Sequence, residues 1–328
     1  MPKYTEVFEY AQTCIQAHVP CLIRGAPGVG KSSLIKQLAS EMGIGFVDIR
    51  AAMLDPVDIL GIPVPNREER TVEWLTPDFW QQEGAGIFCL DELAQASPAT
   101  QKALSQPVLD HMVGQYKLNP NWHIIAASNL TTDRAGVGQL LSHFKNRFTH
   151  IIYDIDIEDW VRWALKADVM TEVIAFIRWR GELLAPEIDH DSDAYPTPRS
   201  WEFISDLLKT NPPKHLEYQL MQGTIGEGAA AEFKGFLNVY RDLPDPDHVI
   251  MNPDTARVPD DTSTLYALTG ALAQRATVAT IGRIIQYGRR IQPEFNVIMM
   301  RDAMNKSEEI TSTREFITWA SDNQHIIL

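Results

Sequence analysis

The fold of this chain is decided by eight consecutive residues, Gly25-Ala26-Pro27-Gly28-Val29-Gly30-Lys31-Ser32. The glycines let backbone N–H groups turn toward a phosphate without a side chain in the way. A short apolar run, Cys21 to Ile23, precedes the stretch and is typical of a buried strand, whereas Lys31 to Ser40 has helical spacing. We therefore predict a phosphate-binding loop between a strand and a helix; a chance glycine-rich turn would not account for both flanking elements.

This loop predicts the ligand as well as the fold. The ammonium group of Lys31 is expected to reach the β- and γ-phosphates of ATP, and the hydroxyl group of Ser32 to coordinate Mg²⁺. The ATP-binding residues predicted from the sequence are Gly25, Ala26, Pro27, Gly28, Val29, Gly30, Lys31, Ser32, Ser33 and, from a later helix, Arg199.

Two acids follow the apolar run from Gly86 to Leu90, which has the pattern of another buried strand. Asp91, at the end of that strand, is predicted to share the Mg²⁺ site with Ser32. Glu92 is predicted to orient or deprotonate the attacking water. Alone, such a pair could be two solvated acids, but its position after a phosphate-binding loop favours the catalytic interpretation.

Three further residues are catalytic candidates. Asn129 ends the predicted strand from Trp122 and could hydrogen-bond the γ-phosphate or the water, although a turn residue would have the same position. Arg147 could stabilise transition-state charge in a neighbouring subunit, but an isolated arginine is more often a surface residue. Arg199 lies in the first turn of a helix opened by Thr197-Pro198, where the helix dipole disfavours a cation; this slight conflict hints at function.

Strands alternate with helices up to about residue 155, which predicts a parallel α/β sheet sandwiched by helices. A proline-rich stretch near residues 55–80 is expected to be an inserted hairpin or loop. Residues 156–328 have helical patterns and are predicted to form an all-α domain with a C-terminal extension. Within it we expect Trp160, Trp163, Trp179 and Trp201 in the core, Arg178 and Arg180 covering a helix face, and a long connection over residues 242–261.

Composition limits the partners. The net charge of −14 disfavours a general DNA-binding protein, which would need a basic footprint, and keeps proteins as the expected partners. The three cysteines lack metal-ligand spacing, and we see neither a signal peptide nor a membrane span, so a reducing cytoplasmic location is expected.

The chain resembles the AAA+ ATPases, and within them the MoxR-like group, over roughly residues 5–210. Residues 25–32 match the Walker A motif and residues 87–92 match Walker B with its glutamate. The proline-rich stretch near residues 55–80 fits the helix-2 insert of this clade. Asn129 falls where that family has sensor 1, and Thr197-Pro198-Arg199-Ser200 resembles sensor 2 in a helical lid. Asn146-Arg147-Phe148 resembles the segment carrying the trans-acting arginine finger, although Asn146 replaces the usual acid.

The resemblance implies a ring, usually a hexamer, with ATP at each subunit junction and Arg147 entering the neighbouring site. It further implies a chaperone-like activity that remodels a protein client, together with a partner carrying a von Willebrand factor A domain. Three alternatives stay open from the sequence: a nucleic-acid motor or loader on the same core, a nucleotide switch without hydrolysis, and, as a poorer fit, a metabolic kinase.

Overall fold

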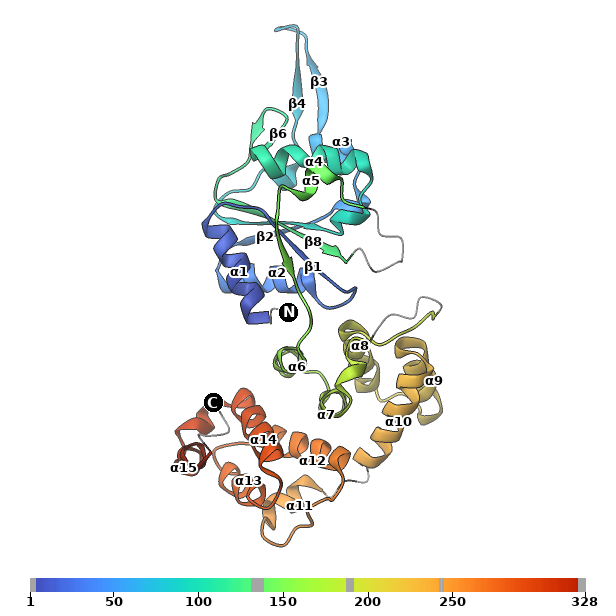
Figure 1. Ribbon diagram of the computed structural model, residues 1–328, viewed down its shortest axis with the longest axis vertical. Helices are drawn as coiled ribbons and strands as arrows, with labels where there is room; N and C mark the ends of the chain where they lie inside the picture. Colours follow the sequence, from blue (N-terminus) through green and yellow to red (C-terminus); the bar gives the residue numbers. More distant parts are fainter. Residues whose placement is uncertain (1–3, 131–138, 187–191, 242, 244, 324–328) are drawn as a thin grey trace. The chain divides into compact units, whose positions relative to one another are not determined.

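The chain folds into two compact units, Met1–Asp156 and Ile157–Leu328 (Figure 1). A computed structural model describes residues 4–130, 139–186, 192–241, 243 and 245–323. The first unit is built on a parallel sheet and the second is helical in the part that the structure describes.

A five-stranded sheet organises the first unit. Its strands lie in the order β2-β5-β8-β1-β9, and each neighbouring pair is parallel. Parallel neighbours need crossover connections, so the strands are not adjacent in sequence order. The strands are β1 (Cys21–Gly25), β2 (Gly45–Arg50), β5 (Gly86–Asp91), β8 (Trp122–Asn129) and β9 (Thr149–Ile152).

Both faces of this sheet are covered. Along β5, Ile87 and Cys89 belong to the apolar cluster that includes residues of α1 and α2, whereas Phe88 and Leu90 belong to the cluster on the other side. A strand buried on two faces needs apolar side chains at every position, which is why β5 reads as a continuous apolar run. This confirms the predicted α/β sandwich. The helices of this unit are α1 (Tyr4–Gln16), α2 (Lys31–Glu41), α3 (Pro56–Leu60), α4 (Pro98–Asp110) and α5 (Ser142–Lys145).

Two small hairpins accompany the sheet. The proline-rich stretch forms α3 and then an antiparallel hairpin of β3 (Ile62–Asn66) and β4 (Thr71–Leu75). Figure 1 shows this hairpin extending away from the helices of the first unit. The second hairpin, β6 (Met112–Val113) with β7 (Tyr116–Lys117), precedes β8. Short 3-10 turns lie at Ala51–Met53, Asp78–Trp80 and Leu93–Gln95.

Helices make up the described part of the second unit, as the sequence predicts. They are α6 (Ile157–Lys166), α7 (Thr171–Trp179), α8 (Pro198–Lys209), α9 (Lys214–Ile225), α10 (Glu227–Arg241), α11 (Pro246–Met251), α12 (Thr262–Gln274), α13 (Ile281–Gly288), α14 (Pro293–Lys306) and α15 (Arg314–Asp322), with 3-10 turns at Gly181–Leu183 and Glu308–Ser312. None of the helices described is long and apolar enough to cross a membrane.

Three expectations about this helical unit were wrong in detail. The stretch from residue 242 to residue 261 is not only a connection, because it contains α11, which Asp245 caps and Pro246 begins. Trp179 is 37% exposed, since it stacks on Phe236 at the edge of the core. Trp163 is half-buried, while Trp160 and Trp201 are buried as expected.

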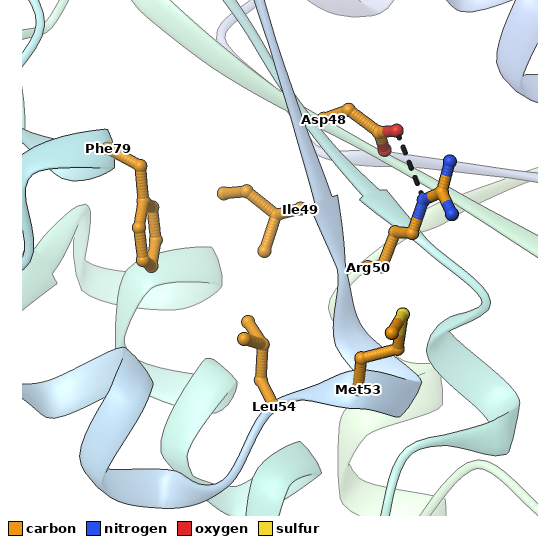
Figure 2. A pocket seen from close by; sticks show the side chains of 6 residues that line it. All are labelled: Asp48, Ile49, Arg50, Met53, Leu54 and Phe79. Atoms are coloured by element: carbon orange, nitrogen blue, oxygen red, sulfur yellow. Dashed lines mark hydrogen bonds and ion pairs between the residues drawn. The ribbon is translucent and has the colours of Figure 1, made fainter.

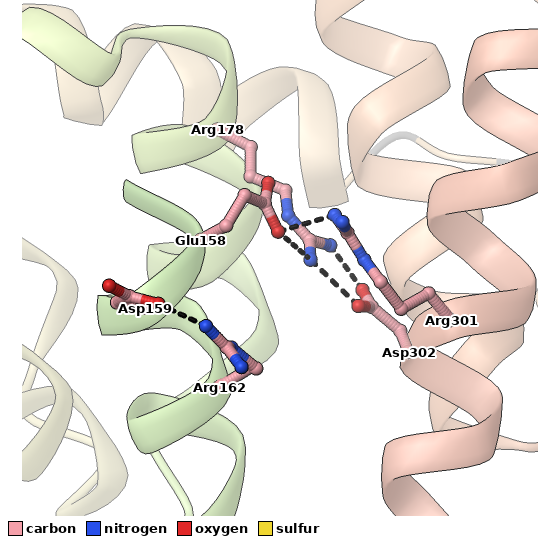
Figure 3. Close-up of polar contacts among 6 residues, drawn as sticks. All are labelled: Glu158, Asp159, Arg162, Arg178, Arg301 and Asp302. Carbon is pink, nitrogen blue, oxygen red and sulfur yellow. Dashed lines mark hydrogen bonds and ion pairs between the residues drawn. The ribbon is translucent and has the colours of Figure 1, made fainter. Parts of the chain in front are cut away.

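Arg178 was also expected on a helix face, but its side chain is only 5% exposed. It forms an ion pair with Asp302, whose side chain is 3% exposed, and it contacts Glu158 as well (Figure 3). Burial alone lowers the pKa of Arg178, but Asp302 and Glu158 raise it above its ordinary value, so the guanidinium stays charged. The pair joins α7 to α14, and Arg301 adds a contact from α14 to Glu158 on α6.

We expect Arg178→Ala to lower the free energy of unfolding by about 3–5 kcal/mol, because Asp302 would be left buried without its cation. Urea unfolding of the full chain, followed by circular dichroism, would measure the change. Lys209→Ala is the matched control, because Lys209 pairs with exposed acids and its loss should cost less than about 1 kcal/mol. Equal effects of the two substitutions would contradict a structural role for the buried pair.

Candidate nucleotide site

The carboxyl ends of three neighbouring strands converge on one edge of the sheet. Gly25 at the end of β1 is in register with Asn129 at the end of β8, and β5 ends beside them at Asp91. In open α/β sheets this edge is where ligands bind. Residues predicted from distant parts of the sequence therefore meet in one place.

The loop after β1 depends on its glycines. Gly28 and Gly30 have φ values of +75° and +89°, a backbone region that favours glycine. Gly25 is restricted by space instead, because a Cβ there would lie 2.4 Å from the carbonyl oxygen of Tyr153. Gly30 caps α2, so the helix N-terminus directly follows the loop.

The remaining loop residues divide between core and surface. Val29 is buried in the cluster beneath the loop, and Ala26 packs against the same cluster. Pro27 and Ser32 are half-buried, whereas Ser33 is exposed in the first turn of α2. The apolar anchors hold the loop on the sheet and leave its polar groups at the edge.

Lys31 crosses the loop and reaches the neighbouring strand. Its Nζ donates to the carbonyl oxygens of Gly25 at 3.0 Å and Ala26 at 2.8 Å, and to Oδ1 of Asn129 at 2.9 Å. The residue is only 8% exposed. The ammonium is thus held at the sheet edge by the end of β8 as well as by its own loop.

Ser32 and Asp91 lie in direct contact. The Oγ atom of Ser32 donates to Oδ2 of Asp91 at 2.6 Å, and the backbone N–H of Glu92 donates to Oδ1 at 2.9 Å. Asp91 is therefore fixed through both carboxylate oxygens. Glu92 has an exposed side chain and a left-handed φ of +53°, which is uncommon for a residue with a Cβ.

The thiol behind these acids contributes no charge to the site. Cys89 precedes Asp91 by two residues on β5 and is fully buried. Burial, with a smaller effect of the charge of Asp91, raises the pKa of the Cys89 thiol well above its ordinary value. The negative charge at the end of β5 thus belongs to the two carboxylates.

Arg147 belongs to the same unit but not to this edge. It lies two residues before β9, and β9 begins in register with Cys21 at the start of β1. The four residue-to-residue distances along β1 from Cys21 to Gly25 add up to about 13 Å. Arg147 therefore lies near the amino-terminal ends of the strands, opposite the end where the loop lies. One of its guanidinium N–H groups donates to the carbonyl oxygen of Ser105 on α4 at 2.6 Å.

Arg199 belongs to the second unit. It is exposed in the first turn of α8, after a capping box in which Thr197 and Ser200 bond each other's backbone N–H groups. This cap explains why the helix begins at Pro198. The predicted contact between Arg199 and a phosphate remains a prediction.

One residue at the sheet edge escaped the sequence prediction. Arg50, at the end of β2, is in register with Asp91 and makes an ion pair at 3.5 Å with Asp48. Both residues line a pocket of about 290 Å³, in which the side chains of Ile49, Met53, Leu54 and Phe79 form the apolar part (Figure 2). Its signal in the sequence was weak: Arg50 ends a short strand in which only Asp48, Ile49 and Arg50 alternate between charged and apolar residues.

Comparison with known proteins agrees with this geometry. The family model described as "ATPase family associated with various cellular activities (AAA)" matches residues 18–150. Midasin from Dictyostelium discoideum is 32% identical over 145 residues, which are 40% of this chain and 2% of that protein. Midasin from Giardia intestinalis is 29% identical over 171 residues, which are 48% of this chain and 4% of that protein. The chain thus spans only a small fraction of the length of these relatives.

Among solved structures, NtrX from Brucella abortus in complex with ATP has a TM-score of 0.41 at 13% identity, over 99% of this chain and 68% of that one. The parallel sheet, the loop between β1 and α2, and the family match over residues 18–150 lead to one assignment: the first unit of this chain is an AAA+ ATPase domain.

Proposed function

We propose that this chain hydrolyses ATP as a subunit of a ring-forming ATPase of the MoxR type, and that it uses the energy to remodel a protein client. The observation that carries the proposal is the convergence of Lys31, Ser32, Asp91 and Asn129 at one sheet edge through contacts of 2.6–2.9 Å. Each of these side chains offers the group that triphosphate chemistry requires at that point.

Binding of the triphosphate rests on the loop and Lys31. The backbone N–H groups between Gly25 and Ser32 and the N-terminus of α2 favour a polyanion. Lys31 supplies the cation, and its contact with Asn129 keeps the ammonium and the amide beside each other. Asn129 is then available to position the γ-phosphate or the attacking water.

The donor set of Ser32 and Asp91 fits Mg²⁺. A hydroxyl and a carboxylate oxygen are hard ligands, and they already lie 2.6 Å apart. The described residues contain no cluster of three or more acids, histidines or cysteines that could enclose a metal. Mg²⁺ usually takes only a few ligands from protein and the rest from phosphate and water, so the two oxygens of Ser32 and Asp91 are a sufficient protein contribution. When bound, Mg²⁺ would neutralise charge on the phosphates.

Glu92 is proposed as the general base. Its carboxylate follows Asp91 directly, and its side chain is exposed at the sheet edge. The backbone N–H of Glu92 donates to Asp91, and this bond fixes the backbone from which the Glu92 side chain extends toward the water. A carboxylate there can orient the water and accept its proton.

Arg147 is proposed to act on the site of a neighbouring copy. Its position near the opposite sheet edge separates it from the loop of its own unit, so a catalytic role requires a second subunit. The bond to Ser105 gives the guanidinium a fixed support on α4. A ring supplies such a neighbour for every site, and Arg199 from the helical unit is proposed to complete the phosphate contacts.

The finer assignments rest on the sequence resemblance. The MoxR-like group is favoured by the order of the motifs and by the inserted hairpin of β3 and β4. A protein client is favoured by the net charge of −14, which opposes nucleic-acid binding. A partner with a von Willebrand factor A domain is proposed from the habit of that group.

We expect Glu92→Gln to bind ATP and to hydrolyse it about a hundredfold or more slowly than the parent, because the amide cannot accept the proton. Phosphate release measures hydrolysis, and a fluorescent ATP analogue measures binding.

Lys31→Ala should instead lose the binding of ATP, which the same fluorescent analogue measures. Chelation of Mg²⁺ by EDTA should abolish turnover of the parent.

Glu69→Gln serves as the control for charge removal, since Glu69 is an exposed acid at the hairpin tip. It should hydrolyse ATP at the parent rate. Parent-like hydrolysis by Glu92→Gln would show that the general base is another residue.

We expect Arg147→Ala and Lys31→Ala to be inactive alone and to recover activity when mixed. In a mixed ring, a subunit with Arg147→Ala keeps an intact loop, and a neighbour with Lys31→Ala keeps an intact arginine. Steady-state phosphate release across mixing ratios measures the recovery. If Arg147→Ala alone hydrolyses ATP at the parent rate, or if mixing restores nothing, a trans role for Arg147 is wrong.

A further inference from the structure

The hairpin of β3 and β4 has an unusual surface. All five residues of β4 and four of the five in β3 are exposed, so the hairpin has no core of its own. Its register pairs Pro63 with Trp74 and Pro65 with Val72. Paired residues share a face, so these four side chains make one face that is entirely apolar. Val72 is 53% exposed and Trp74 is 46% exposed.

The two edges of the hairpin differ in hydrogen-bonding capacity. Residues whose amides point toward the partner strand alternate with residues whose amides point outward. Proline has no amide hydrogen, so Pro63 and Pro65 suit the outward positions of β3. That edge therefore offers no N–H group at either position, which is a known protection against pairing with another strand.

The other edge is open. The residues paired with Pro63 and Pro65 are Trp74 and Val72, and their N–H and C=O groups point outward from β4. Among the residues that the structure describes, β4 pairs with no strand other than β3, and no turn or loop carbonyl accepts a bond from either amide. An extended segment could thus add to β4 through main-chain bonds, whereas addition to β3 would lack donors.

The carboxylate of Glu73 further restricts which segment could add to β4. Glu73 lies between Val72 and Trp74 and points to the opposite face of the hairpin, where its neighbour across the strands is Val64. Glu73 takes part in no ion pair among the described residues, although it accepts a hydrogen bond from the amide of Asn66. A strand added to β4 could place a lysine or arginine beside this carboxylate.

We propose that β4 is the docking edge for an extended client segment that pairs with Val72 and Trp74, with apolar side chains on the Pro63–Trp74 face and a basic side chain beside Glu73. The proposal rests on the proposed function, since it names the kind of client that the ATPase would remodel. Main-chain pairing supplies affinity that does not depend on one sequence, and the two faces supply the selection.

The test uses a fluorescein-labelled peptide, Thr-Val-Lys-Val-Thr-Val, whose alternation matches the two faces. Fluorescence anisotropy with the full chain measures the affinity. Val72→Pro removes the outward amide in the same way that Pro65 does opposite it, so the hairpin should still fold. We expect the affinity for the peptide to fall about tenfold or more, because one main-chain hydrogen bond is lost and the pyrrolidine ring of the proline blocks the edge of β4.

Val72→Thr is the matched control, because threonine keeps both the branched shape and the amide, and it should bind within about threefold of the parent. Methylating the peptide's backbone nitrogens should also weaken binding to the parent. Equal affinity of Val72→Pro and Val72→Thr, or no binding of the peptide by the parent, would overturn strand addition. Circular dichroism and phosphate release by each variant confirm that the protein is folded.

The same measurements separate this inference from the proposed function. Peptide binding is an equilibrium quantity that needs no hydrolysis, whereas the ATPase assignment is tested by Glu92→Gln. Loss of binding in Val72→Pro alone supports the docking edge even if Glu92 proves not to be the base. Parent-like binding by Val72→Pro overturns the docking edge while the ATPase assignment stands.

Discussion

The contact between Ser32 and Asp91 depends on nearly every feature of the first unit. The two residues are 59 positions apart and belong to segments on either side of β8, so a bond of 2.6 Å between them requires the strand order β5-β8-β1 in the observed register. The same order brings Asn129 to Lys31. A one-residue slip of β5 or β8 would turn the side chain of Asp91 or Asn129 to the other face of the sheet. The apolar layers on both faces hold the register, and the site is its consequence.

Much of this arrangement could be predicted from the sequence. The loop glycines, the apolar run of β5 and the acids that end it each have a local signature, and parallel strands bring such ends to one edge. Arg147 and Arg199 had weaker signals, because a single arginine looks alike on a surface and at an interface. Arg50 had almost none, since its proximity to Asp91 follows from strand order, which no local pattern encodes.

The helical unit also shows that local sequence patterns do not reveal contacts between distant residues. Helical spacing identified where helices lie, but it assigned Arg178 to a surface. Its burial is allowed by Asp302, which lies 124 positions later, and no window of sequence contains both residues. The hairpin of β3 and β4 is the opposite case. Pro63 and Pro65 have no amide hydrogen, so their effect on the edge of β3 follows from the residue type alone. Side chains with a covalent restriction are easier to interpret than those whose state depends on a distant partner.

The distance along the chain between Arg178 and Asp302 has a consequence for synthesis. A growing chain exposes α7 long before the ribosome has made α14, so for that interval Arg178 has no buried anion to meet. The packing of α7 into its final surroundings would then bury an unpaired cation, and this desolvation cost is a large part of the stability of a typical domain. The helical unit should therefore complete its core late, after residue 302 has emerged, while the sheet of the first unit can already be closed.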